Sequence, residues 1–140
     1  MKRSPLRKKS KEPISKVQRK LWELCKQIIR KRYPHTCYTC GQTRLTGTNL
    51  QTGHMWAKAS LGAYLKYDLR VLRPQCSRCN LFLGGMGAEF YKNMLEEIGP
   101  QKMAQLEGDR KVTVKAYDHY IKLIAEYTRI LDSELSTVTF

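Results

Sequence analysis

The chain has 140 residues, enough for one compact domain with a modest core, and it carries 26 Lys and Arg against 12 Asp and Glu, a net charge of +14. No run of apolar residues approaches the length of a membrane span, and no apolar segment follows the basic N-terminal residues as it does in a signal peptide. These features argue against a membrane protein or a secreted one and predict a soluble intracellular protein.

The positive charge is concentrated at the N-terminal end. Residues 1–32 hold 13 basic and 2 acidic residues. We expect residues 1–12 to form a disordered basic tail, because they combine many charges with Ser and Pro and show no apolar period. Such a segment binds polyanions, since each neutralised phosphate releases counterions. We favour nucleic acid as the partner over an anionic membrane, and over a tail that only keeps the protein soluble.

Residues 14–33 predict a basic amphipathic helix that ends before Pro34. Its apolar face carries Val17, Leu21, Leu24 and Ile28. Its other side carries the candidate DNA-binding residues Lys16, Arg19, Lys20, Lys26 and Arg30. An ordinary amphipathic surface helix is the alternative, and both interpretations can hold together.

Four of the five cysteines form two CxxC pairs, Cys37 with Cys40 and Cys76 with Cys79. In an intracellular protein such pairs are more often zinc ligands than disulfides, and two CxxC turns complete a tetrahedron of thiolates. Gly41 follows the first pair, where a zinc knuckle needs a tight turn. We therefore predict a structural zinc site, with disulfide or redox chemistry as the alternative. Cys25 is expected to pack as a small apolar residue.

The segment between the two pairs has 35 residues, whereas a simple zinc ribbon has about 15–20 there. The insertion contains Gly53-His54, and Asn80 follows the second pair directly. Zinc would thus join a segment that brings a histidine to one that brings an asparagine. Within this core, residues 35–87, we expect short strands near the first pair and over 48–54, and a short helix after the second pair.

Residues 88–135 predict a helical C-terminal part. One helix covers 88–98 and stops at Gly99-Pro100, a short one follows at 101–107, and the last runs from about 114 to 134. Thr113 is its candidate N-cap. The predicted buried stripe of the last helix is Tyr117, Ile121, Ile124 and Leu131. The expected fold is α+β, a single domain over 13–140 with a small zinc-knuckle core between N- and C-terminal helices.

The pattern Cys37-x-x-Cys40, Gly53-His54, Cys76-x-x-Cys79-Asn80 resembles the zinc-containing HNH, or ββα-metal, nucleases. It resembles more closely the lambdoid phage NinG (Rap) recombination proteins, which share a CxxCG turn, a Gly-His and the Gln-Cys-x-x-Cys-Asn segment found here from Gln75. The resemblance covers roughly residues 14–135. It implies a ββα-metal core and an endonuclease that acts on Holliday junctions and D-loops in the cytoplasm of the bacterial host.

The resemblance also implies roles for individual residues. His54 matches the general base, Asn80 matches the ligand of a catalytic Mg²⁺ or Mn²⁺, and the four paired cysteines match the ligands of the structural zinc. Two positions depart from the wider HNH pattern. Gly53 stands where many members have an aspartate ligand, which suggests a metal held by few protein groups. Val71 stands where the middle asparagine is expected, so the group that orients His54 stays open, a backbone carbonyl being one candidate.

Further candidates rest on weaker patterns. Asp68 is either an additional metal ligand or a surface charge, and Arg73 and Arg78 are candidate phosphate clamps that would also bind DNA. Asn80 is alternatively a helix cap, and His54 alternatively a structural residue. Branched DNA is the expected partner. A homodimer through the tyrosine-rich last helix is also predicted, because a four-way junction has two-fold symmetry, and other phage recombination proteins are candidate partners.

Three rival functions fit parts of the pattern. A non-catalytic zinc-knuckle protein would bind DNA without cutting it. An HNH endonuclease without branch preference would cut linear duplex as readily as junctions. A ribosome-associated zinc protein would explain the positive charge, but it would leave Gly53-His54 without a role.

Overall fold

The computed structural model describes residues 11–136, so all but the last two residues of the predicted basic tail lie outside the described part. The first element is α1 (Ile14–Arg32), which ends one residue before the predicted limit. Tyr33 is already extended, as expected for a residue that precedes proline. The buried face of α1 consists of Val17, Leu21, Cys25, Ile28 and Ile29. This face packs on the core, while most of the predicted DNA-binding residues of α1 are exposed.

A two-stranded antiparallel sheet lies at the centre of the molecule. Strand β1 (Gln51–His54) pairs with β2 (Leu72–Gln75), and His54 lies opposite Leu72. The connection runs through three short helices, η2 (Lys58–Ser60), α2 (Ala63–Lys66) and η3 (Leu69–Val71). A one-turn π-helix, η4 (Arg78–Phe82), follows β2 and contacts β1. The strand expected over 48–54 and the short helix after the second cysteine pair are both confirmed.

The strand expected near the first cysteine pair is not present in the described part of the chain. Residues 35–45 form a loop that backbone hydrogen bonds close, and η1 (Gly47–Asn49) follows it. The Tyr38 N–H donates to the carbonyl of Pro74 at 2.8 Å, so the loop docks on the outer edge of β2. Pro74 has no N–H and suits an edge position. The loop therefore reaches the sheet through a single backbone contact, without forming a third strand.

The C-terminal part contains α3 (Gly87–Asp109) and α4 (Ala116–Ser136). Gly99 breaks α3 with φ 86° and ψ 165°, where the sequence predicted a stop at Gly99-Pro100. Helix α4 begins at Ala116, so Lys115 and not Thr113 precedes its first residue, and the prediction of Thr113 as N-cap was wrong. Its predicted buried stripe was right in part: Leu131 is buried, Tyr117 and Ile124 are half-buried and pack against the core, and the prediction for Ile121 was wrong. The residues that are buried are Tyr120, Leu123, Tyr127 and Leu131, while Ile121 is exposed.

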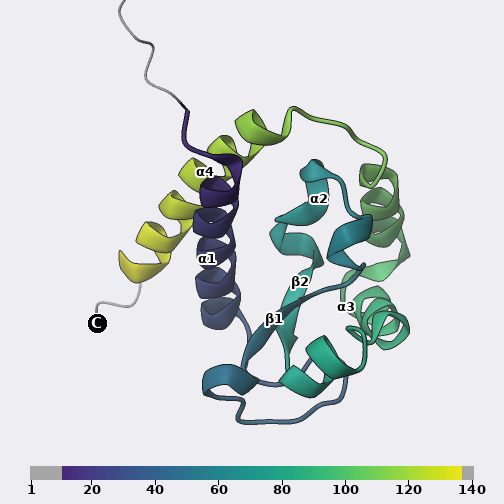
Figure 1. The fold of residues 1–140 in the computed structure, drawn as a ribbon. Helices are drawn as coiled ribbons and strands as arrows, with labels where there is room; N and C mark the ends of the chain where they lie inside the picture. Colours follow the sequence, from purple (N-terminus) through teal and green to yellow (C-terminus); the bar gives the residue numbers. More distant parts are fainter. Residues whose placement is uncertain (1–10, 137–140) are drawn as a thin grey trace, which may run out of the picture.

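The larger core lies between α1, α4, the sheet and α3, with the α1–α4 pair on one side of the hairpin and α3 on the other (Figure 1). The Tyr127 hydroxyl donates to the Tyr67 carbonyl at 2.7 Å, which sets the rotation of α4. Tyr120 and Tyr127 thus face inward, and they do not form the outer tyrosine surface that suggested a dimer. The mixed α+β class is confirmed. No helix within residues 11–136 is both long and apolar enough to cross a bilayer.

Candidate metal centre and nucleic-acid groove

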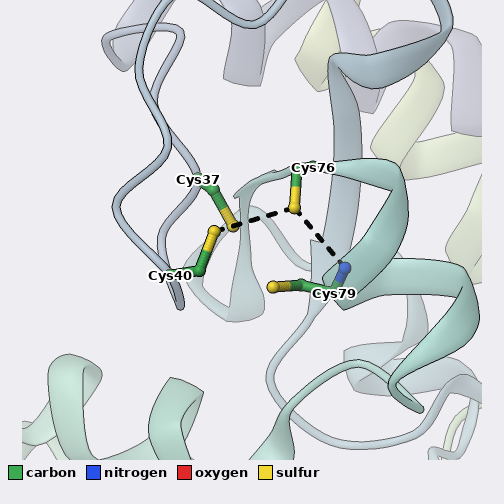
Figure 2. A group of neighbouring side chains, drawn as sticks. All are labelled: Cys37, Cys40, Cys76 and Cys79. Carbon is green, nitrogen blue, oxygen red and sulfur yellow. Dashed lines mark hydrogen bonds between the residues drawn. The ribbon is translucent and has the colours of Figure 1, made fainter.

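The four paired cysteines converge on one point, as predicted. The Sγ atoms of Cys37, Cys40, Cys76 and Cys79 all lie within 4.8 Å of one another, and none of these residues forms a disulfide. Figure 2 shows the two pairs facing each other from the loop and from the start of η4. Four sulfur ligands at this spacing suit a tetrahedral zinc ion. The centre could therefore hold zinc, and the disulfide alternative has no support in the structure.

Each pair sits on a turn that points its sulfur atoms inward. In the first turn the Cys37 N–H donates to the Gln42 carbonyl at 2.8 Å, and the Gly41 N–H donates to the Cys37 carbonyl at 3.0 Å. Gly41 has φ +80°, a conformation that favours glycine, so the tight turn predicted there is confirmed. In the second turn the Cys79 N–H donates to the Cys76 Sγ at 3.4 Å.

Gln75, to which sequence reasoning gave no role of its own, ties the two turns together. Its side chain is fully buried, and its Nε2 donates to the Thr39 hydroxyl at 3.0 Å and to the Gly85 carbonyl at 2.9 Å. A Cβ atom on Gly53 would lie 1.7 Å from the Gln75 Oε1. Any side chain at Gly53 would displace Gln75. The structure thus explains why no aspartate precedes His54.

His54 ends β1 and is held by a backbone carbonyl. Its Nε2 lies 2.8 Å from the Lys66 carbonyl oxygen. Because a carbonyl can only accept, Nε2 carries the proton and Nδ1 of the neutral ring is left as an acceptor. The carbonyl that the sequence analysis offered as one candidate for orienting His54 is therefore present, and it replaces the side chain missing at Val71.

The surroundings of His54 keep its ring neutral. The ring stacks on Trp22 with centroids 5.2 Å apart and planes 15° apart, and the Lys58 Nζ lies 5.3 Å from the Trp22 centroid. Burial lowers the pKa of His54 to about 4; the Lys66 hydrogen bond opposes this shift, and the charges of Lys58 and Lys66 add to it. Sequence reasoning missed Trp22 as a neighbour of His54 because it comes from α1, far away in the chain, and it missed Lys58, four residues after His54, because no motif marks that residue.

Two adjoining cavities form a groove beside His54. The first, of about 410 Å³, is lined by His54, Lys58, Leu81 and the glycine-rich turn after η4, and the second, of about 400 Å³, by Lys26 and Arg30. Trp22, Thr52 and Asn80 line both. No aspartate or glutamate is among the described residues that line either cavity. The groove is therefore positively charged along its length and suits a polyanion.

Asn80 lies inside η4, on the wall of the groove shared with His54. Its Nδ2 donates to the Gln51 Oε1 at 2.8 Å, and its Oδ1 accepts no hydrogen bond from residues 11–136. The residue before η4 is Ser77, so Asn80 is not the helix cap that was its alternative role. The structure thus brings together the two residues that the resemblance implied, His54 and Asn80.

Two other candidate residues are placed elsewhere. Arg73 is 3% exposed, its guanidinium donates to Glu97 at 2.7 Å, and it packs against the rings of Tyr33 and Tyr38. The prediction of Arg73 as a DNA-binding residue was wrong, because its guanidinium is buried and already paired with Glu97. Asp68 caps η3 and pairs with Arg70 at 2.8 Å, and it lines a different cavity from that of His54. It is therefore not brought to the candidate site.

The basic residues of α1 divide between two faces. Lys26 and Arg30 line the groove, although Lys26 also pairs with Glu23 at 2.8 Å. Lys16, Arg19 and Lys20 line a hollow between α1 and α4 instead. Arg78 is exposed at the start of η4, next to the second cysteine pair. Of the seven DNA-binding candidates, Lys26 and Arg30 are thus the two that line the groove itself.

The contrast between Arg73 and Arg78 yields a testable prediction. We expect Arg73→Ala to lower the free energy of unfolding by about 2–4 kcal/mol, because it removes a buried cation packed on two rings and leaves Glu97 without its cationic partner. Arg78→Ala should change it by less than about 0.5 kcal/mol. Urea denaturation of both variants measures the difference. Equal stability of the two variants would contradict the structural role of Arg73.

Comparison with known families agrees with this geometry. A family model described as bacteriophage lambda NinG protein matches residues 2–134. The chain belongs to the NinG family. The stretch matched to NinG includes all four zinc-site cysteines, His54 and Asn80, and NinG membership indicates a role related to phage recombination. Comparisons with curated proteins and with solved structures each returned no significant match.

Proposed function

We propose that this protein is a metal-dependent DNA endonuclease of the HNH, or ββα-metal, type that hydrolyses phosphodiester bonds in branched recombination intermediates. One observation carries the proposal. The His54 ring is fixed by the Lys66 carbonyl so that a neutral Nδ1 is left to accept a proton, in a basic groove that it shares with Asn80. An oriented imidazole with an unprotonated nitrogen, lining a basic groove, has the geometry that a general base needs.

The chemistry follows from the residues around the groove. His54 Nδ1 takes a proton from a water molecule as the water oxygen bonds to phosphorus and the bond to the leaving oxygen breaks. The stacked Trp22 and the Lys66 carbonyl hold the ring in one orientation, which removes the entropic cost of aligning it. Lys58 places an ammonium group close to His54, where it can bind the scissile phosphate.

The donor set of the groove suits a hard cation held by few protein ligands. Asn80 offers its free Oδ1, and Thr52 lines the same cavity, whereas no carboxylate among residues 11–136 does so. Mg²⁺ usually keeps several waters and binds through one or two carboxylates plus substrate phosphate, so in this groove water and phosphate would supply most of the coordination shell. When bound, such an ion, Mg²⁺ or Mn²⁺, would stabilise negative charge on the phosphate and the leaving oxygen.

The remaining features of the proposal concern its partners. Lys26 and Arg30 line the groove, so they can contact the DNA backbone, and the exposed Arg78 is a further candidate for such a contact. The preference for branched DNA rests on NinG membership. A homodimer, contact with other phage recombination proteins and a place in the cytoplasm of the bacterial host belong to the same proposal. A dimer would let the two-fold axis of a four-way junction coincide with that of the protein.

The deciding experiment compares cleavage of a labelled four-way junction with that of a linear duplex of the same sequence, in Mg²⁺ and in Mn²⁺. Metal-dependent cutting of the junction with little cutting of the duplex is the expected result. Equal cutting of both substrates would support the endonuclease activity and contradict the preference for branched DNA. Binding without cutting in either metal would overturn the endonuclease.

A non-catalytic zinc DNA-binding protein is the second candidate, and one observation favours it. The groove lacks the carboxylate that metal-dependent nucleases commonly use, because Gly53 replaces the aspartate and Asp68 pairs with Arg70. This candidate predicts tight, salt-dependent binding and no cleavage product in the experiment above. The oriented His54 has no role in it, which is why we rank it second.

The lowered pKa of His54 predicts the pH dependence of cleavage. Protonation removes the base, so a pKa of about 4 moves the acidic limb of kcat/KM below the ordinary histidine value of 6.5. At pH 5.5 an ordinary histidine would be about 10% neutral, whereas His54 should be more than about 90% neutral. We therefore expect kcat/KM at pH 5.5 to stay close to its value at pH 7. A tenfold fall between these two pH values would contradict the assignment.

A further inference from the structure

The residues that follow the second cysteine pair expose a continuous apolar run. Leu81, Phe82 and Leu83 are 62%, 79% and 44% exposed, and together we call them the apolar tip. Single exposed apolar residues are common, but three consecutive large ones on a soluble domain indicate an interaction surface. The run is not part of either core cluster, so the interior of the fold does not need it.

The apolar tip is mounted on a rigid base. The Leu83 N–H donates to the Arg78 carbonyl at 2.9 Å, and the Gly85 N–H donates to the carbonyl of the zinc-site residue Cys79 at 2.8 Å. Gly84 and Gly85 have positive φ, which turns the chain back sharply. The Gly85 carbonyl also accepts the hydrogen bond from the buried Gln75. These hydrogen bonds to the second cysteine turn and to Gln75 therefore fix the direction in which the tip points.

The position of the apolar tip indicates what it contacts. Leu81 lines the same cavity as His54, Lys58 and Asn80, so the tip stands at one edge of the basic groove. Arg78 is exposed on the same turn. A strand whose phosphates follow the groove would bring its bases against the tip, because positive charge flanks the tip and no acidic residue among residues 11–136 lines the groove.

We propose that the apolar tip, with Phe82 at its centre, inserts against unstacked bases at the branch point of the DNA. It thereby selects branched over continuous duplex substrates. The inference deepens the proposed function and rests on the groove binding DNA. Aromatic and aliphatic side chains insert between base steps in this way, and the pairs at a branch point, whose stacking is already interrupted, cost least to separate. A second copy of the chain is the weaker occupant, because three side chains fall far short of the roughly 20–30 residues per partner in a stable interface.

The test uses Phe82→Ala in the full chain, with Ile121→Ala as control, since Ile121 is an exposed apolar residue on α4. Binding to a four-way junction and to linear duplex is measured without added divalent metal, and a 2-aminopurine base at the branch reports unstacking. We expect Phe82→Ala to weaken junction binding by about fivefold to a hundredfold and to abolish the fluorescence rise. Duplex binding and the control variant should change by less than about twofold.

The outcomes separate this inference from the endonuclease itself. Branch-dependent fluorescence without cleavage in any metal would support the proposed role of the apolar tip and contradict the proposed endonuclease activity. If Phe82→Ala cleaves DNA with an unchanged preference for junctions, the proposal that the apolar tip selects branched DNA is wrong. An equal loss of junction and duplex binding would also overturn it, as would a change of oligomeric state in sedimentation, which would show that a second copy occupies the surface.

Discussion

Replacement of His54 by alanine is expected to lower the rate of junction cleavage by about 10²- to 10⁴-fold, the contribution of a positioned general base. DNA affinity should change by less than about twofold, because the basic residues that line the groove are untouched. His54 lies at the end of β1 with its ring stacked on Trp22, so the substitution removes the base without removing a core residue. Single-turnover cleavage and equilibrium binding of the same variant give the two numbers.

His35→Ala is the matched control, because His35 is an exposed histidine whose ring forms one hydrogen bond within residues 11–136, to the Arg30 carbonyl at 3.1 Å. It should cleave at the wild-type rate. Full activity of His54→Ala would remove His54 as the base and leave the non-catalytic DNA-binding protein as the better account. Loss of binding together with cleavage would instead show that His54 supports the groove structurally.

Removal of zinc is expected to have the largest effect on stability. The cluster around the four sulfurs contains only Leu45 and Leu50 as further buried apolar residues, with Met86 packed against it, which is too little to fold the loop by itself. The purified protein should contain one zinc ion per chain. Cys79→Ala should abolish zinc binding and lower the free energy of unfolding by about 5 kcal/mol or more. Elemental analysis and thermal denaturation measure both quantities.

Cys25→Ala provides the comparison for this experiment. Cys25 is buried in α1, away from the zinc centre, and burial raises the pKa of its thiol to about 12. The variant should keep its zinc and lose only about 1–2 kcal/mol. Full zinc content in Cys79→Ala, or zinc loss in Cys25→Ala, would show that the metal is held elsewhere.

Several features of the fold could be predicted because they depend on neighbours in the chain. The apolar period placed α1 to within a residue, Gly99-Pro100 marked the break in α3, and Gly41 marked the first turn. The two cysteine pairs were found by spacing alone, because a metal accepts only a few ligand arrangements. In α4 the same reasoning was only partly right, since its apolar residues cover two adjacent faces and the contact with Tyr67 decides which one is buried.

In the candidate site, too, some residues could be predicted from the sequence and others depended on tertiary contacts. Cysteine spacing and the resemblance singled out His54 and Asn80 together with the four cysteines, and the structure places the first two on one groove wall. The structure does not bring Arg73 and Asp68, which were predicted as a phosphate clamp and a metal ligand, to this site. Each of them forms an ion pair elsewhere, Arg73 with Glu97 and Asp68 with Arg70.

The amino-acid sequence by itself determined the helical segments, the tight turn at Gly41 and the cysteine cluster that could hold a metal, all of which follow from local periodicity and ligand chemistry. The tertiary structure alone decided which charges reach the groove and what surrounds His54. Trp22 comes from α1, far from His54 in the sequence, and the packing of α1 stacks it on the ring. Contacts between such distant segments depend on how whole elements pack, and no short sequence pattern encodes that.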